Sequence, residues 1–407
     1  MATVIENIPE RHGADITHAR RIARPIRWTV RGDPEPTPER WRALGAALNK
    51  GDLPMDRLIT WMSEYGMREA RTLYKRAVEQ GIDSVVDAPM PLRTFFAQVE
   101  QPPAWLDHNL LERGAHACHR TGLTGMRVLR DLALMTGYQA SAINRTLVAT
   151  GSLERGPQRR LAETTKWWLD CTGRGGMARF APGYCNTLHV RLIHGLIRRH
   201  VQRRPDWDES QWGLPINQTD MAATHLGFSV IFLLGSRAMG MPLSAADGQA
   251  VMHLWRYIDW LMGLDEAWLP QTEQEGRTLL YQILLSQPTP DTSSRQLGRA
   301  LMDEPLQRHY PRFAWLRGRY ERARHISITR LFTDAQGMRD LGLPAWMPPW
   351  YPAIGIPLKL ARHARSRVLP GGIERVARAG RAEQIDYLSV LFGEAEPAIH
   401  EPVPAGD

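Results

Sequence analysis

The sequence predicts an all-α protein, a single large helical domain with few or no strands. Nearly every informative segment repeats its apolar residues at steps of three and four, which is the period of an amphipathic helix. Strand signals are almost missing, since the two best, Thr29-Val30 and Ser84–Val86, are very short. With 407 residues, 43% of them hydrophobic, the chain has enough apolar material to bury one sizeable core.

Helices are expected over nine segments that share this period. In chain order they are Trp41–Leu48, Leu58–Arg76, Leu110–Ala117, Gly125–Thr150, Gln158–Leu169, Asn186–Arg203, Asp220–Met239, Ala245–Leu261 and Glu275–Ser286. Start signals support three of them. Thr37 is a good N-cap with Pro38 in the first helical position, and Asp220 and Ser244 are the expected N-caps of two later helices.

The C-terminal part is proline-rich and then basic. Leu343–Pro357 contains too many prolines to be helical throughout. Leu358–Arg381 is expected to form a basic helix pair, broken at Pro370-Gly371-Gly372. This pair either docks on the body as an ordinary surface element or makes a peripheral membrane contact.

The domain boundaries follow from composition. Residues 1–30 are polar and are expected to form an N-terminal arm, residues 31–390 the helical domain, and residues 391–407 a flexible acidic tail.

Composition also excludes several classes of protein. Three cysteines are too few for a disulfide framework, and no apolar run reaches the length of a transmembrane segment. Since no export signal is apparent at the start, a cytoplasmic location is expected. The net charge is +8, but the arginines are dispersed and no nucleic-acid-binding motif accompanies them, so no nucleic-acid partner is expected.

The strongest constellation of polar residues lies on two successive predicted helices. Arg160, Glu163 and Thr164 share one helix face, and Trp167 follows one turn later. After a glycine-rich turn, the next helix carries His194 between Arg191 and Arg198. A neutral imidazole flanked by arginines on an apolar helix suits a haem pocket, with a nitrogen for iron and cations for the propionates. A buried core histidine is the alternative that periodicity alone leaves open.

Several segments together resemble the family of latex-clearing proteins (rubber oxygenases) and MpaB oxygenases. They are Phe95–Trp105, Gly137-Tyr138 leading to Thr150–Leu153, Arg159–Thr164 with Trp167, Val190–Arg198, and Gly213–Asp220. The resemblance implies a globin-like helical core that encloses a non-covalent haem b.

The same resemblance implies roles for single residues. His194 is the expected iron ligand, and Arg160 and Thr164 are expected in the pocket as catalytic residues. Glu163 is the third such candidate, and it stands where rubber-cleaving members can carry a lysine. The catalytic base of such members falls on Asn144, which cannot accept a proton, and the nearest acid is Glu154.

The expected function is therefore a haem b-dependent dioxygenase that uses O2 to cleave a carbon–carbon double bond in an isoprenoid or another hydrophobic substrate. A haem-binding sensor or redox protein without turnover is the alternative, because Asn144 replaces the base. The apolar and methionine residues of Leu226–Leu234 and Met239–Met241 either line a substrate channel or pack as core.

Overall fold

All the regular structure in the described part of the chain is helical. The computed structural model describes residues 7–151 and 157–393, and it contains no strand in these ranges. Thr29-Val30 lies in the turn that follows the first helix, and Ser84 ends a short 3-10 turn. The predicted fold class is therefore confirmed. Residues 394–407, which include most of the predicted tail, lie outside the described residues, as does Glu154.

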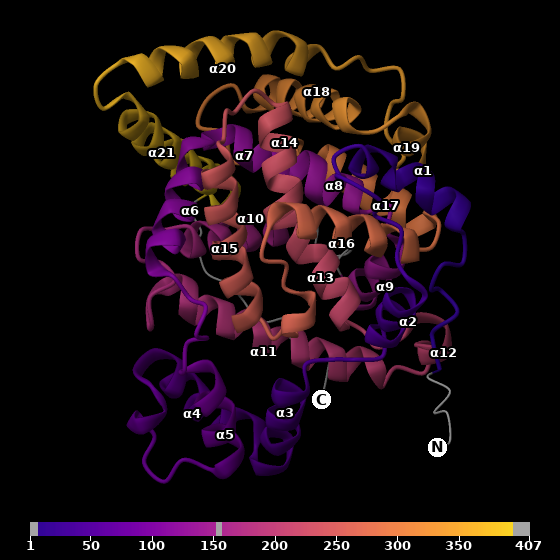
Figure 1. Ribbon diagram of the computed structural model, residues 1–407, viewed down its shortest axis with the longest axis vertical. Helices are drawn as coiled ribbons and strands as arrows, with labels where there is room; N and C mark the ends of the chain where they lie inside the picture. Colours follow the sequence, from indigo (N-terminus) through magenta and orange to yellow (C-terminus); the bar gives the residue numbers. More distant parts are fainter. Residues whose placement is uncertain (1–6, 152–156, 394–407) are drawn as a thin grey trace.

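The helices follow one another with short connections (Figure 1). The α-helices are α1 (Ile16–Arg27), α2 (Pro38–Ala47), α3 (Leu53–Tyr65), α4 (Met67–Gln80), α5 (Met90–Val99), α6 (His108–Arg120), α7 (Gly122–Val128), α8 (Met135–Gly137), α9 (Ser141–Ala149), α10 (Pro157–Cys171), α11 (Pro182–Gln202), α12 (Glu209–Trp212), α13 (Gln218–Leu226), α14 (Phe232–Ala238), α15 (Ala245–Leu261), α16 (Glu273–Ser286), α17 (Thr292–Asp303), α18 (Ala314–Phe332), α19 (Ala335–Asp340), α20 (Trp350–Val368) and α21 (Gly372–Phe392). The 3-10 turns are η1 (Ile82–Ser84), η4 (Glu266–Trp268) and η5 (Glu304–Gln307), and the π-helical turns are η2 (Leu129–Leu134) and η3 (Gly227–Ile231).

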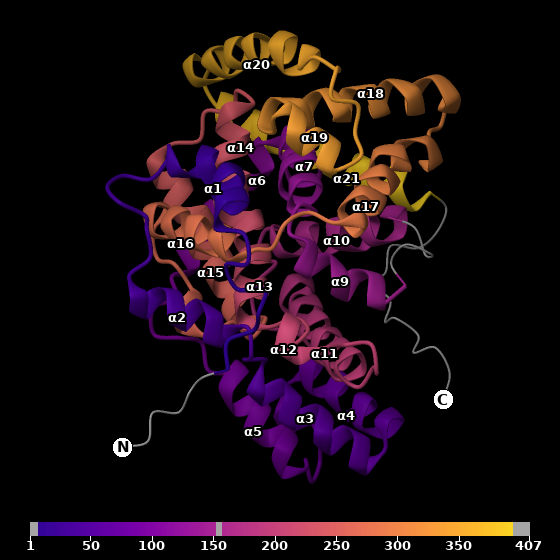
Figure 2. The ribbon, with the colours of Figure 1, turned by 90° about the vertical axis from the view of Figure 1, so that its right-hand side faces the viewer.

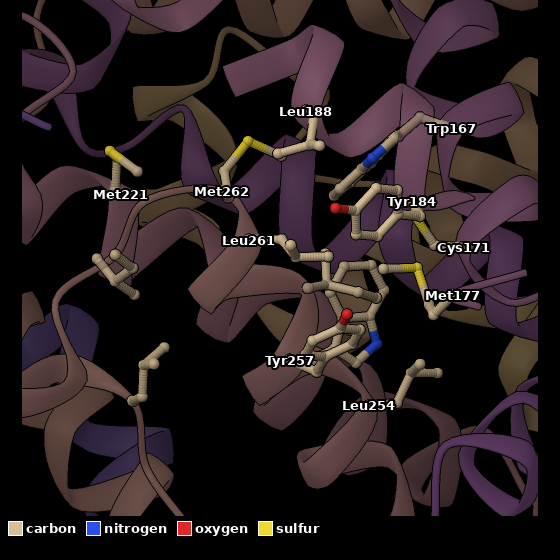
Figure 3. Packing of buried hydrophobic residues seen from close by; sticks show 14 of the residues in the cluster. Trp167, Cys171, Met177, Tyr184, Leu188, Met221, Leu254, Tyr257, Leu261 and Met262 are labelled. Carbon is tan, nitrogen blue, oxygen red and sulfur yellow. The ribbon is translucent and has the colours of Figure 1, made fainter. Parts of the chain in front are cut away.

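The molecule is elongated, with different helices at the two ends of its long axis. Figures 1 and 2 both place α3, α4 and α5 at one end of the long axis and α18 and α20 at the other. Between them, α10, α11, α13 and α15 form the centre. The main hydrophobic core joins side chains from α2 to α16, and Figure 3 shows part of it, where Trp167, Tyr184 and Leu188 pack near Tyr257 and Leu261. A second, smaller core lies between α8, α17, α18 and α19.

Close helix approach in the main core depends on glycine. A Cβ atom built on Gly114 of α6 would lie 2.5 Å from the carbonyl oxygen of Ala250 in α15. Any larger residue would force these two helices apart, because the obstacle is backbone and cannot move aside as a side chain can.

The N-terminal region is more ordered than a simple arm. Helix α1 packs on α16, and Arg21 forms ion pairs with Asp334 and Asp340. Asp15 caps α1 by accepting a hydrogen bond from the backbone N–H of His18.

Two of the three predicted helix starts are confirmed. Thr37 caps α2 with Pro38 in the first helical position, and Ser244 caps α15 through a capping box with Asp247. The prediction for Asp220 is wrong. Helix α13 begins three residues earlier, because Asn217 accepts the backbone N–H of Asp220.

Two long predicted helices are interrupted. The segment Leu58–Arg76 is split at Gly66, whose φ of 117° and ψ of 111° no helical residue adopts. The segment Gly125–Thr150 changes to π-helical geometry at η2 and then breaks before α9.

The two π-helical turns lie side by side. Each interrupts an otherwise continuous helix, η2 between α7 and α8, and η3 between α13 and α14. They meet through small residues, since a Cβ built on Gly227 would lie 3.5 Å from the Cβ of Ala133. Turns of this kind are frequent at functional sites.

The helix that contains η3 is apolar and central. Gln218–Ala238 is the single helix among the described residues that is long and apolar enough to cross a membrane by length and composition. More than half of it, 56%, is buried inside the fold, as the core helix of a helical protein would be.

A buried charge network anchors η2 to the C-terminal helices. Glu304 accepts hydrogen bonds from Arg130 (2.9 Å) and from Arg308 (2.7 Å), while Asp131 contacts Arg130 (2.7 Å) and Nδ1 of His325 (2.7 Å). All five side chains are buried. Each charge therefore depends on its partners to offset the cost of leaving water.

Candidate functional site

Helices α10 and α11 form an antiparallel hairpin whose register is fixed by polar contacts. Trp167 Nε1 donates to Thr187 Oγ1 (3.1 Å), and Asn186 Nδ2 donates to an Asp170 carboxylate oxygen (2.7 Å). The glycine-rich turn lets the helices start close together. A Cβ on Gly183 would lie 2.6 Å from the carbonyl oxygen of Gly176.

This register places Arg160 level with His194. Arg160 lies seven residues before Trp167, and His194 lies seven residues after Thr187, so both are two turns further along and on the same faces. Trp167 and Thr187 are buried, whereas Arg160 and His194 are half-buried and Thr164 is exposed. Arg160 and His194 are thus less enclosed than Trp167 and Thr187.

His194 is held as a neutral imidazole. Burial is the main cause that lowers its pKa to about 3, and the nearby His225 and Arg198 add to the effect. Its Nδ1 atom is buried without a hydrogen-bond partner among the described residues. A neutral imidazole is the form of histidine that binds a metal ion.

A second histidine lies close to His194, and the sequence analysis did not identify it. His225 of α13 is buried, and its Nδ1 lies 2.5 Å from a carboxylate oxygen of Asp259 in α15. Burial raises the pKa of Asp259. The sequence does carry a signal for this pair: one histidine and one aspartate lie on two otherwise apolar helices. Because buried polar side chains need partners, such residues are expected to pair with each other.

Arg191 and Arg198 pair with two carboxylates at the start of α3, one of them its N-cap residue Asp52. Arg191 makes a bidentate pair with Asp52 (2.6 and 2.8 Å), and Arg198 Nε pairs with Asp56 (3.2 Å). The sequence predicted both arginines as haem-propionate partners. Both arginines are therefore paired with carboxylates, and helical spacing gives no sign of these acids, which lie about 140 residues earlier.

Trp167 belongs to a buried aromatic cluster. Its ring meets Phe228 of η3 edge-on (5.4 Å between centroids) and Trp255 of α15 (5.6 Å), and Phe228 stacks on Trp255 (4.9 Å). Trp167 itself lies two helical turns from Arg160 and from the level of His194 along the hairpin.

Glu163 and Asn144 also have partners among the described residues. Glu163 forms an ion pair with Arg159 (3.1 Å) on its own helix. Asn144 is buried, and its Nδ2 donates to the Tyr138 carbonyl (2.7 Å) and to Ser294 Oγ (3.3 Å). Asn144 therefore serves as a link between α9 and its neighbours.

No group of three His, Cys, Asp or Glu side chains in residues 7–151 and 157–393 has the arrangement to hold a metal ion.

The comparisons with known proteins concern the family and the fold of the chain. Residues 123–362, more than half of the chain, match the family described as ER-bound oxygenase mpaB/B'/Rubber oxygenase, catalytic domain. The chain belongs to this oxygenase family. Membership places it among the oxidoreductases and confirms the resemblance read from the sequence.

One relative and one solved structure extend the finding. The rubber oxygenase of Streptomyces sp. (strain K30) is 23% identical over 200 residues, so the match spans about half of either chain (48% of each). The structure of latex clearing protein in the closed state superposes with a TM-score of 0.62 at 17% identity. It covers 83% of this chain and 91% of that chain, which shows a shared helical fold.

Proposed function

We propose that this member of the family is a haem b-dependent oxygenase that uses O2 to cleave a carbon–carbon double bond in an isoprenoid or another hydrophobic unsaturated substrate. The observation that carries the proposal is His194, a neutral imidazole level with Arg160 on the α10–α11 hairpin. Family membership supports the oxygenase chemistry, and the name of the Streptomyces relative supports a hydrophobic substrate.

The residues at the site offer a suitable nitrogen donor for a haem, but the second ring nitrogen of that donor lacks the usual hydrogen-bond acceptor. His194 offers a neutral nitrogen donor, as an axial ligand must. Its Nδ1 has no acceptor among the described residues, although a ligating histidine usually donates its second ring N–H. Arg160 is the predicted cation that forms no ion pair with a described residue, so we assign the propionate contact or the contact to oxygen to it and not to Arg191 or Arg198.

The bound haem would supply the activation of O2. The chain's own residues would orient the bound molecules and exclude water from the site. Arg160 donates hydrogen bonds from a fixed cation, and Thr164, one turn away, offers a hydroxyl that donates and accepts. The cluster of Trp167, Phe228 and Trp255 keeps water from the apolar side of the site. Glu163 is paired with Arg159, and its carboxylate places negative charge beside the cation of Arg160.

The test compares His194→Ala with His200→Ala, an exposed histidine on the same helix. The wild-type protein and His200→Ala should show a Soret band after haem reconstitution, and His194→Ala should lose it. A wild-type protein without a Soret band would contradict the haem assignment. An unchanged spectrum of His194→Ala would contradict the ligand assignment.

A haem-binding sensor or redox protein without turnover is the second candidate. It is favoured by Asn144, whose amide is committed to Tyr138 and Ser294 and provides no base. Oxygen uptake by the haem-loaded protein with an unsaturated isoprenoid, compared with its saturated analogue, separates the two. Uptake with the unsaturated compound alone identifies the enzyme, and no uptake above the substrate-free rate with either compound identifies the protein without turnover.

A further inference from the structure

Exposed apolar side chains concentrate at one end of the molecule. Of the 22 large hydrophobic side chains that are exposed in the described ranges, 14 lie between Leu306 and Ile385. Figures 1 and 2 both show α18 and α20 together at this end. Scattered exposed apolar residues need no explanation, but a cluster of this kind indicates an interaction surface.

The start of α18 contributes three large side chains. Phe313, Trp315 and Leu316 are 77%, 68% and 60% exposed. Phe313 also has left-handed backbone geometry, with φ 52° and ψ 42°. A bulky residue adopts this conformation at a cost of roughly 1–3 kcal/mol. An exposed ring makes no core contact that would offset that cost within the isolated chain.

Helix α20, which packs against α18, also carries exposed apolar side chains. Trp346 precedes it and is 78% exposed, while Ile354 and Leu358, one turn apart on one face, are 63% and 67% exposed. Within α20 itself the buried residues are Pro352 and His363. We call these six side chains, Phe313, Trp315, Leu316, Trp346, Ile354 and Leu358, the α18–α20 face.

Positive charge accompanies these apolar residues. Helix α20 carries one lysine and three arginines and no acidic residue, and the start of α18 adds three more arginines. None of these six arginines forms an ion pair with a described carboxylate. They are exposed, and they are Arg312, Arg317, Arg319, Arg362, Arg365 and Arg367.

Three more cations meet around one tyrosine at the start of α20. Arg127, Arg324 and Lys359 lie 5.4, 5.2 and 5.4 Å from the ring of Tyr351. The carboxylate close to them is Glu321, which is already paired with Arg324. Burial, with help from these two arginines, lowers the pKa of Lys359 to about 8. Three cations are thus gathered around Tyr351, and Glu321 and the more deeply buried Asp131 offset part of their charge.

We propose that the α18–α20 face docks on a lipid bilayer that carries anionic headgroups. Aromatic and aliphatic side chains beside arginines are the composition of an element that lies in the membrane interface. A second copy of this chain would bring the same positive charges against one another, so the charge favours an anionic partner. The proposal uses no residue of the α10–α11 hairpin and stands independently of the haem.

The test is sedimentation of the full chain with vesicles. Phosphatidylcholine vesicles that contain phosphatidylglycerol should bind the wild-type protein, and pure phosphatidylcholine vesicles should bind it far more weakly. Each arginine near an anionic membrane surface adds a similar increment to the binding free energy. The triple variant Arg362→Gln/Arg365→Gln/Arg367→Gln should therefore weaken vesicle binding roughly a hundredfold. Trp315→Ser/Leu316→Ser should weaken it by roughly tenfold or more.

The matched control is Trp28→Ser, because Trp28 is 72% exposed and lies at the end of α1, outside the face. It should bind as the wild type does. Three results would overturn the proposal: no binding to anionic vesicles, an equal loss in the Trp28 variant, or a wild-type dimer that Trp315→Ser/Leu316→Ser converts to monomers while vesicle binding is absent.

Discussion

His119 shows how burial of a single side chain sets a pH dependence of stability. Its Nε2 lies 2.6 Å from the carbonyl oxygen of Thr172, so this nitrogen carries the proton and donates. Burial is the main cause that lowers the pKa of His119 to about 4, and the cation of Arg381 adds to it. Between this value and the unfolded pKa of about 6.5, the unfolded chain binds the extra proton.

The predicted consequence is a loss of stability on acidification. As the pH falls from about 6.5 toward 4, His119 should reduce the free energy of unfolding by up to about 1.4 kcal/mol per pH unit. His119→Gln keeps a donor for Thr172 and removes the titration. Urea unfolding at a series of pH values should show a shallower decline for this variant, and parallel curves would contradict the assignment.

Sequence patterns at this scale predict local contacts well and long-range partners poorly. Thr37 and Ser244 cap their helices as predicted, because a cap acts on backbone within three residues. The partners of Arg191 and Arg198 lie at the start of α3, and that of His225 lies on α15. Helical periodicity shows which face such a side chain occupies but does not identify what packs against that face.

At the scale of elements, Glu304 decides how η2, η5 and α18 hold together. It is buried between Arg130 and Arg308, both of which are also buried. Glu304→Gln should lower the free energy of unfolding by roughly 3–5 kcal/mol, because two buried guanidinium groups lose their shared counter-charge.

Asp303→Asn is the control for this prediction. Asp303 is the preceding residue, and it pairs with Arg322 at the solvent-exposed surface. Its substitution should cost less than about 1 kcal/mol, because exposed ion pairs contribute little. Denaturant titrations of both variants provide the measurement, and similar losses would contradict the assigned role of Glu304.

Element boundaries were predictable where a strong local signal ends a helix. Pro370-Gly371-Gly372 separates α20 from α21 as expected. Gly66 was missed as a break because glycine also occurs inside helices, and its backbone geometry there depends on how α3 and α4 pack. The π-helical turns are not visible in the apolar periodicity, because their residues keep the apolar period of the flanking helices.

At the scale of the whole molecule, local stability should be uneven, because some helices lie inside the main core and α20 lies largely outside it. Helices α11 and α15 lie within the core that joins α2 to α16, whereas α20 buries only Pro352 and His363. Amide hydrogens of α20 should therefore exchange with solvent far sooner than those of α11 and α15. Hydrogen-exchange mass spectrometry on the free protein checks this, and comparable protection of the three helices would contradict it.

The fold class was predictable from the sequence because the helical period of the apolar residues recurs along the entire chain. The α10–α11 hairpin was predictable as well, since its two helices are neighbours in the sequence. What required the structure was the arrangement of distant segments, above all α3 against α11 and α18 against α20. Those contacts bring together residues that no periodic pattern relates.

The paired π-helical turns have a consequence for comparing this chain with its relatives. A π-helical turn contains one residue more than the α-helical turn it replaces, and one residue corresponds to a rotation of about 100°. A relative with regular α-helix at η2 or η3 should therefore align with a single-residue gap inside a helix instead of in a loop. An alignment that moves such a gap to the nearest loop would assign every residue between gap and loop to the wrong neighbour, and His225 lies two residues from η3.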